Sequence, residues 1–219
     1  MRKKFDEELD KLKIDLTKMG HLVEVSIENM IDAFKNHDKA LAKEIIANDR
    51  LINDMERAIE SRTFGLMLTQ QPIATDLRDV TTALKIVTDL ERIGDQAADI
   101  AEIILNFEGE HAYKTVEHIP TMAKKAKIMV RESIDAFIKK DLTSAQMIIQ
   151  MDDEIDALFS EVKHEVVEII QENSEKIDYC LDFLMIAKHL EKIGDHAVNI
   201  CEWLEFNQTG SMNDQKLIW

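Results

Sequence analysis

A thirteen-residue stretch occurs twice in this chain, one hundred residues apart. The first copy, LERIGDQAADIAE, spans residues 90–102, and the second, LEKIGDHAVNICE, spans residues 190–202, with eight of the thirteen positions identical. The match continues upstream at an offset of 103, where the sequence IDAF occurs at residues 31–34 and again at 134–137. Self-similarity at a fixed period indicates a duplicated structural unit. The sequence therefore predicts two halves with the same local fold.

Helices are the elements that the composition favours. The 219 residues are 45% apolar and 32% charged, and they include only 6 Gly and 2 Pro, too few for the many turns of a sheet protein. Apolar residues spaced by three and four predict six helices, at about residues 1–36, 39–65, 72–107, 120–139, 142–172 and 174–206. Asp38 and Asp141 are the expected N-caps of the second and fifth helices.

The predicted fold class is all-α, with two tandem pseudo-symmetric three-helix bundles. Residues 1–107 form the first three-helix repeat, 108–119 a linker, 120–206 the second repeat and 207–219 a loose C-terminal tail.

Charge and cysteine content exclude several classes of protein. The net charge of −16 has the wrong sign for binding a nucleic-acid backbone directly. No run of about 18 apolar residues exists, so direct membrane insertion is not expected. The two cysteines, Cys180 and Cys201, are too few for a disulfide framework, which favours a cytoplasmic location.

The repeated stretch places carboxylates on one helix face. At about 100° per residue, Asp95 lies roughly 40° from Glu91, Asp99 roughly 80° and Glu102 roughly 20°. The second copy presents Glu191, Asp195, Asn199 and Glu202 in the same way. The opposite face of the first copy is apolar and predicted to be core: Ile86, Leu90, Ile93, Ala97, Ile100 and Ile104.

Two interpretations of this face stay open. Charged stripes are usually solvated, but like charges at i, i+4 destabilise a helix, and no lysine lies among the carboxylates of the first copy. Oxygen ligands one turn apart suit Mg, Mn, Ca, Fe or sometimes Zn. Gly94 and Gly194 favour close helix packing over the approach of a ligand to the backbone. His189 and His196 point elsewhere on the helix and are interpreted as surface or packing residues.

No catalytic motif is present. The sequence lacks GxxxxGK[ST], GxGxxG, GxSxG and HExxH, so an enzyme is not expected. A ferritin-like di-iron protein needs two Glu-x-x-His pairs, and Glu161 with His164 supplies one. The other, Glu108 with His111, contains a helix-breaking Gly109. A ferritin-like protein and a purely structural scaffold are the alternatives to a regulatory protein.

The twin motif L-E-[RK]-I-G-D-x-A-x-[DN]-I-x-E resembles the PhoU family, the accessory regulators of bacterial phosphate-specific transport. Supporting signs are DRLIN at residues 49–53, DDEID at 152–156 and DLR at 76–78. The resemblance covers nearly the whole chain. It implies two three-helix bundles in a homodimer, with iron or zinc clusters at the E-[RK]-x-x-D motifs.

The metal positions implied by the resemblance are Glu91, Asp95, Asp99, Glu191, Asp195 and Asn199. Asn199 departs from the pattern because an amide replaces a carboxylate, so the two sites need not bind alike. Second-tier candidates are Asp49, Asn53, Asp152 and Asp156.

The implied function is that of an adaptor between the ATPase subunit of a phosphate ABC transporter and a sensor histidine kinase, which negatively regulates the phosphate-starvation response. No reaction is catalysed. The protein would reach the inner face of the membrane through its partners. An acidic surface repels free phosphate, so a direct phosphate contact would need a bound cation. The role of the asymmetric segment 71–78 stays open.

Overall fold

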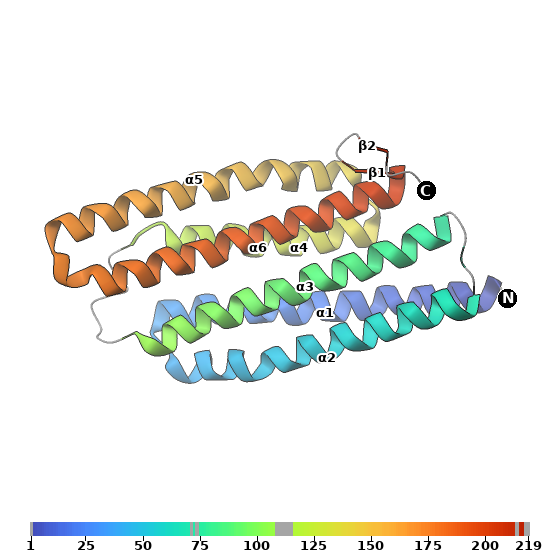
Figure 1. Cartoon of the computed structure of the whole chain (residues 1–219), viewed down its shortest axis with the longest axis horizontal. Coiled ribbons are helices and arrows are strands. Elements are labelled where there is room, and N and C mark those ends of the chain that lie inside the picture. Colours follow the sequence, from blue (N-terminus) through green and yellow to red (C-terminus); the bar gives the residue numbers. More distant parts are fainter. Residues whose placement is uncertain (1, 71, 73–74, 108–115, 213–214, 217–219) are drawn as a thin grey trace.

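The computed structural model describes residues 2–70, 72, 75–107, 116–212 and 215–216. Within this part of the chain there are six long helices, which lie side by side along the long axis of the molecule (Figure 1). Their bounds are α1 (Arg2–Asn36), α2 (Lys39–Gln70), α3 (Thr75–Asn106), α4 (Ile119–Lys139), α5 (Leu142–Glu172) and α6 (Ile177–Thr209). A 3₁₀ turn, η2 (Ser174–Lys176), joins α5 to α6. The predicted all-α fold of two three-helix bundles is confirmed.

Three helix ends differ from the sequence-based boundaries. Helix α2 continues past Gly65 to Gln70, because Leu66 is buried and the Thr69 hydroxyl donates to the Gly65 carbonyl over 2.7 Å. Helix α3 begins at Thr75 rather than Pro72, and residues 71, 73 and 74 lie outside the described part.

The C-terminal end of the chain also differs from the prediction. Helix α6 runs beyond Phe206 to Thr209 and ends at Gly210, whose φ of 75° favours glycine. Against the expectation of a loose tail, β1 (Ser211–Met212) and β2 (Gln215–Lys216) pair as a short antiparallel ribbon. Most of the predicted linker, residues 108–115, lies outside the described residues.

The same helical turn is built twice. Helices α1 and α4 each end at a residue with left-handed backbone, His37 (φ 55°) and Lys140 (φ 56°), and an aspartate cap follows. Asp38 accepts from the backbone N–H groups of Ala40 and Leu41 at 2.9 and 3.0 Å. Asp141 accepts in the same way from the next helix, at 3.0 and 3.1 Å. Both predicted caps are confirmed.

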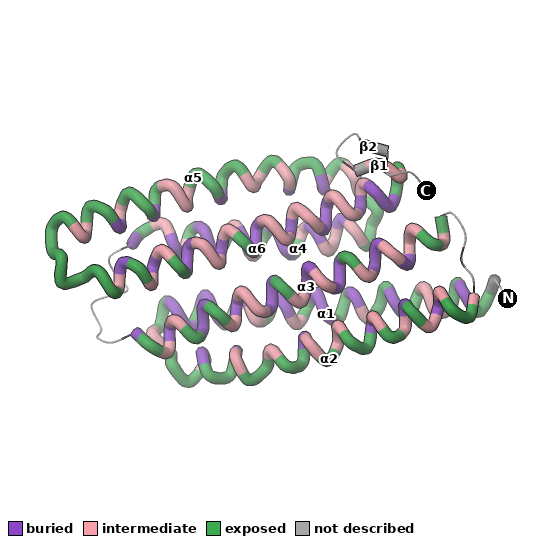
Figure 2. Tube along the Cα trace, viewed as in Figure 1, coloured by how far each residue is buried: buried purple, intermediate pink, exposed green. Residues whose placement is uncertain are grey.

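The two bundles share one hydrophobic core. Helix α3 packs against both α2 and α6, while α1 packs against α4, so buried residues form a continuous cluster across the halves (Figure 2). The apolar face predicted for α3 is confirmed, because Ile86, Leu90, Ile93, Ala97, Ile100 and Ile104 are all buried. Among the described residues, no helix has both the length and the apolar character needed to span a bilayer.

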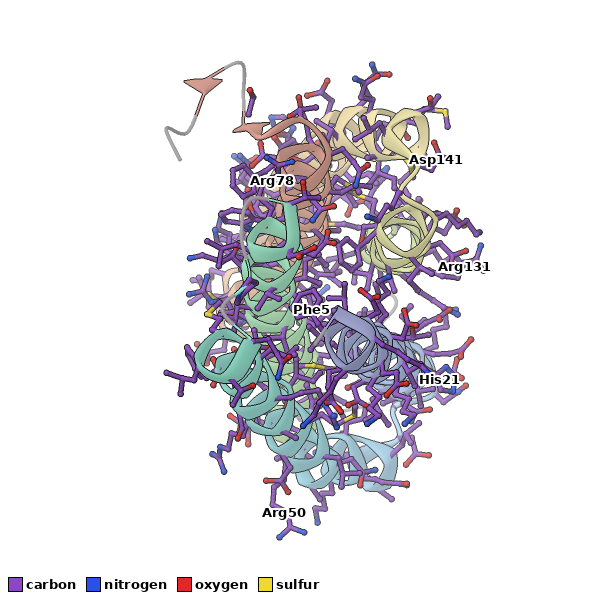
Figure 3. All side chains as sticks on the ribbon, turned by 90° about the vertical axis from the view of Figure 1, so that its right-hand side faces the viewer. Phe5, His21, Arg50, Arg78, Arg131 and Asp141 are labelled. Carbon is purple, nitrogen blue, oxygen red and sulfur yellow. The ribbon has the colours of Figure 1, made fainter. Side chains whose placement is uncertain are left out.

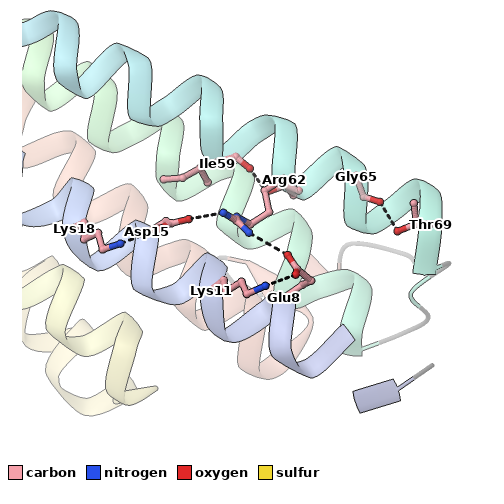
Figure 4. A network of polar contacts seen from close by, with 9 residues as sticks. Glu8, Lys11, Asp15, Lys18, Ile59, Arg62, Gly65 and Thr69 are labelled. Carbon is pink, nitrogen blue, oxygen red and sulfur yellow. Dashed lines mark hydrogen bonds and ion pairs between the residues drawn. The ribbon is translucent and has the colours of Figure 1, made fainter. Parts of the chain in front are cut away.

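Charged side chains lie mainly on the outside of the bundle. In the end-on view, His21, Arg50 and Arg131 point away from the core (Figure 3). One ion-pair network ties α1 to α2: the Arg62 guanidinium lies 3.0 Å from a Glu8 oxygen and 3.2 Å from an Asp15 oxygen (Figure 4). Because these groups are exposed to solvent, the pairs add little to stability, and the network mainly fixes the register of the two helices.

Two glycines allow close helix packing. A Cβ atom on Gly94 of α3 would lie 2.8 Å from Ile52 Cδ1 on α2. A Cβ atom on Gly194 of α6 would lie 3.2 Å from Asp152 Oδ1 on α5. Close helix packing at both glycines is therefore confirmed.

The substitution Gly94→Val should lower the free energy of unfolding by about 1–3 kcal/mol, because the added isopropyl group must displace the buried Ile52 side chain. The matched control is Gly65→Ala, where a Cβ meets no atom within 4 Å and helix propensity should raise stability by about 0.5–1 kcal/mol. Urea unfolding followed by circular dichroism measures both. Equal effects at the two glycines would contradict the packing explanation.

Candidate functional site

The first carboxylate cluster lies where α2 crosses Gly94. Asp49 of α2 rests against α3 there, and Glu91 and Asp95 flank the glycine on α3. Asp49 accepts a 2.8 Å hydrogen bond from Asn53, but its second oxygen, Oδ1, is buried without a hydrogen-bond donor. Within the described residues, no lysine or arginine forms an ion pair with Glu91 or Asp95. The first cluster therefore holds partly buried negative charge without a matching cation.

Burial and mutual repulsion make these carboxyl groups hard to ionise. Burial, followed by the charges of Asp95, Glu56 and Asp49, raises the pKa of Glu91 to about 7. The pKa of Asp95 is raised by burial and by Asp99, and the pKa of Asp49 by burial and by Asp95. The first cluster therefore carries a local excess of negative charge that a cation would relieve.

Glu56 of α2 also belongs to the first cluster, and the sequence analysis missed it. Its pKa is raised by burial, by Glu60 and by Asp95. Positions 49, 53, 56 and 60 are spaced by four, three and four residues, so one face of α2 carries an acidic stripe that the sequence alone could have revealed.

The second cluster has the same backbone but a different charge balance. Asp152 of α5 lies against Gly194, its Oδ1 is also buried without a donor, and its pKa is raised to about 6 by burial and by Asp156 and Asp195. However, Glu191 forms an ion pair with Lys188, and Asp195 forms one with Lys192 at 3.0 Å. The second cluster is therefore partly neutralised by its own lysines.

The repeats differ most clearly at three matched positions. Glu56, Glu60 and Thr88 in the first repeat correspond to Phe159, Lys163 and Lys188 in the second. The ammonium groups of Lys163 and Lys188 lie 4.8 and 5.4 Å from the centre of the Phe159 ring, which is the geometry of a cation–π contact. Two acidic side chains and a threonine in one half are thus replaced by an aromatic ring and two cations in the other.

Asp99 and Asn199, the third predicted metal positions of the two motifs, each lie close to a residue of the other repeat. Asp89 of α3 is buried and lies 2.9 Å from His196 Nδ1, and it accepts from the Asn199 amide over 3.1 Å. The counterpart contact is made by His189 of α6, whose Nδ1 lies 2.8 Å from Gln96 Oε1 and 3.6 Å from Asp99 Oδ2.

These two contacts are related by the same one-hundred-residue offset: 89 with 189, 96 with 196 and 99 with 199. Both histidines are therefore packing residues between α3 and α6, as expected, and burial lowers the pKa of His189. The Asn199 amide is directed toward Asp89 rather than toward the carboxylates of its own repeat.

The donor set suits a hard or intermediate cation without being preassembled for one. As the described side chains are placed, no three His, Cys, Asp or Glu groups converge closely enough to hold a metal ion. Each cluster nevertheless offers carboxylate oxygens one turn apart and one buried oxygen without a donor. Glu161 and His164 of the ferritin-like alternative are exposed, and its other pair lies outside the described residues.

The raised pKa values predict a pH dependence. Because folding raises the pKa of Glu91 from 4.5 to about 7, the folded state binds this proton more tightly than the unfolded state does. The resulting stabilisation is complete below about pH 4.5 and is lost as pH rises through about 7. In metal-free buffer, Glu91→Gln should therefore raise the free energy of unfolding at pH 8, by on the order of 1 kcal/mol after allowing for solvent screening.

Urea unfolding of both proteins between pH 4 and 8, with chelator present, measures this effect. The exposed Glu7→Gln is the matched control and should leave the pH profile unchanged. A profile that is the same for Glu91→Gln and wild type would mean that Glu91 is ordinarily solvated.

Comparison with known proteins gives a family match in both halves. The family model described as "PhoU domain" matches residues 16–104 and again residues 119–204. A protein of Clostridium acetobutylicum named phosphate-specific transport system accessory protein PhoU homolog is 38% identical over 214 residues, which cover 97% of this chain and 98% of that protein. A protein of the same name from Rhizobium meliloti is 32% identical over 208 residues, which cover 94% of this chain and 88% of that protein.

Solved structures agree with the sequence matches. The crystal structure of PhoU from Pseudomonas aeruginosa superposes with a TM-score of 0.88 at 31% identity, over 94% of this chain and 100% of that one. The crystal structure of the phosphate transport system regulatory protein PhoU from Streptococcus pneumoniae gives a TM-score of 0.89 at 31% identity, over 96% and 99%.

Proposed function

Because the chain belongs to the PhoU family, we propose that it is an accessory regulator of phosphate uptake through a phosphate-specific transport system. The observation that carries this proposal is the match of the whole duplicated architecture to relatives named for that role, over 97% of this chain in one case. Both halves match the family model, so the resemblance is not limited to one shared motif.

The finer proposal is that of an adaptor. The protein contacts the ATPase subunit of a phosphate ABC transporter and a sensor histidine kinase at the inner face of the membrane, and it restrains the phosphate-starvation response when phosphate is plentiful. A homodimer performs this role, and no reaction is catalysed. Support comes from the sequence, which carries no nucleotide-binding loop or catalytic motif and a net charge of −16, as suits a protein that works through partners.

We also propose that the carboxylate clusters bind iron, zinc or a similar cation. Asp49, Glu91 and Asp95 would hold it in the first repeat, with Asp152, Glu191 and Asp195 as the counterparts in the second. A bound cation would supply positive charge that offsets the repulsion responsible for the raised pKa of Glu91. Because Lys188 and Lys192 already pair with the carboxylates of the second cluster, the first should bind the cation more tightly.

Loss of the gene should raise phosphate uptake and switch on phosphate-starvation genes in phosphate-rich medium, because the restraint on the transporter is removed. Radiolabelled phosphate uptake and transcript levels measure this in a deletion strain of the source organism. Expression of the wild-type chain from a plasmid is the control and should restore both. Unchanged uptake and unchanged transcripts in the deletion strain would refute the proposed role.

Metal content should fall unequally when the two clusters are altered. After loading with iron, zinc or manganese and dialysis, the variant Glu91→Gln/Asp95→Asn should lose most of the retained metal, and Glu191→Gln/Asp195→Asn should lose less. Lys188→Met should increase the metal retained by the second cluster, because it frees Glu191. Elemental analysis gives the metal content and circular dichroism checks the fold.

The control for this experiment is Glu7→Gln, which removes an exposed carboxylate of α1 that belongs to neither cluster. Wild-type protein that retains no metal under these conditions would refute the cation proposal. The uptake phenotype of the deletion strain would be unaffected by that result, so the two proposals fail separately.

A further inference from the structure

A groove lies between α1 and α2 on the outside of the first bundle. It encloses a cavity of about 80 Å³, well above the roughly 10–15 Å³ that one water molecule needs. Its floor and walls are Leu22, Val25, Ser26 and Asn29 from α1 and Ile45, Asn48, Leu51 and Ile52 from α2. Leu51 is 46% exposed and Val25 is 36% exposed, so apolar groups border an opening to solvent. The groove is separate from the carboxylates of Glu91 and Asp95, which lie on α3.

The second repeat shows what fills the equivalent space. At the offset of 103, Ser26 and Asn48 of the groove correspond to Met129 and Met151 between α4 and α5. Met129 is fully buried, and Met151 packs against the core. The same fold therefore places two methionine side chains where the first repeat has a hydroxyl and an amide, and this substitution leaves the first repeat hollow.

The rim of the groove also differs between the two repeats. Leu22 and Leu51 correspond to Lys125 and Glu154, which form an ion pair across α4 and α5. In the second repeat the rim is closed by charged side chains that pair with each other. In the first repeat two leucines stand in those places, and Leu51 is nearly half exposed.

One end of the groove is acidic. Asp32 lies about one helical turn beyond Asn29, and Glu44 about one turn before Asn48, which places both near the α1–α2 turn because the two helices are antiparallel. Neither carboxylate forms an ion pair within the described part of the chain, whereas Asp135, the counterpart of Asp32, pairs with Lys139. The other end carries Lys18, which is paired with Asp15 at 3.4 Å.

We propose that this groove is the docking site for one methionine- or leucine-sized side chain, carried by a helix of a protein partner that has a lysine or arginine one turn away. The apolar side chain occupies the space that Met129 and Met151 fill in the other repeat, and the basic group meets Asp32 and Glu44. The occupant is a protein helix because an amphipathic helix presents an anchor and a flanking charge at this spacing. Ser26 and Asn48 supply polar groups beside the anchor.

A peptide series tests the proposal directly. The probes are alanine-based helical peptides with Met, Leu or Ala at the central position and Lys or Glu one turn away, titrated into the full chain and followed by the methyl NMR signals of Leu22, Ile45 and Leu51. The Met and Leu peptides should bind about tenfold or more tightly than the Ala peptide, from the burial of one apolar side chain. Lys should be preferred over Glu. Equal binding of the Met and Ala peptides, or no binding of any, would overturn the proposal.

Closing the groove provides the matched variant. Ser26→Met/Asn48→Met copies the second repeat and should weaken binding of the Met peptide about tenfold, while leaving the circular dichroism spectrum unchanged. Leu22→Lys/Leu51→Glu copies the ion-paired rim of the second repeat and should also weaken binding of the Met peptide. It provides the test if the first variant folds poorly. Gln146→Met/Gln150→Met adds two methionines on the exposed face of α5 and should bind the peptide like wild type. Full binding by both closed variants would overturn the proposal.

The oligomeric state separates a partner from a second copy of this chain. Light scattering should give the same mass for wild type and for Ser26→Met/Asn48→Met. If closing the groove instead converts a dimer to a monomer, the occupant is a second copy of the chain, and the partner proposal is wrong.

Discussion

The close approach of α2 to α3 at Gly94, repeated by α5 and α6 at Gly194, is the constraint on which the rest of the structure depends. A side chain at Gly94 would collide with Ile52, so the missing Cβ lets two long helices pack backbone to side chain along their middle turns. The same contact brings Asp49 against α3 and buries one of its oxygens without a donor. The helix packing at Gly94 therefore also determines the electrostatics of the site, because it brings the mutually repelling carboxylates of the first cluster together.

The duplicated backbone supports two different surfaces. In the first repeat, acidic side chains gather around Gly94, and the α1–α2 groove is hollow. In the second, Lys188 pairs with Glu191, Lys163 lies over Phe159, and the core-packed Met129 and Met151 replace Ser26 and Asn48 of the groove. These differences act in the same direction, although Asp152 Oδ1 of the second repeat stays buried without a donor, as Asp49 Oδ1 does in the first. The first repeat therefore has fewer internal partners for its acidic side chains and for the apolar rim of its groove than the second.

Sequence reasoning was reliable where periodicity or cap chemistry controls the outcome. The apolar face of α3, the caps at Asp38 and Asp141, and the packing role of Gly94 follow from spacing along a single helix, and the structure bears them out. It was less reliable at the end of α2, where the approach of Pro72 led us to end the helix at Gly65, although the helix continues to Gln70 and buries Leu66. Propensity is a weak guide where tertiary contacts decide.

The site was only partly predictable, because its members come from helices distant in the sequence. Glu91 and Asp95 could be found from the repeat, and spacing along α2 marks the acidic face that carries Glu56. Only the structure shows that this face lies close to Glu91 and Asp95. The asymmetry between the clusters was indicated by Asn199, but its main source is the pair of lysines Lys188 and Lys163, which replace Thr88 and Glu60 of the first repeat. Comparing the repeats residue by residue would have shown this from the sequence.

Asp99 connects the first cluster to the junction between the halves. Its charge helps raise the pKa of Asp95, and its carboxylate lies 3.6 Å from His189 across the α3–α6 interface. Because Asp99 interacts with both groups, a change of charge beside Asp95 alters the potential at His189, and solvent screens part of this effect since the Asp99 side chain is 49% exposed. The buried contact of Asp89 with His196 holds the opposite end of the same interface. Charge at the first cluster and the packing of the two repeats are therefore physically coupled through one side chain.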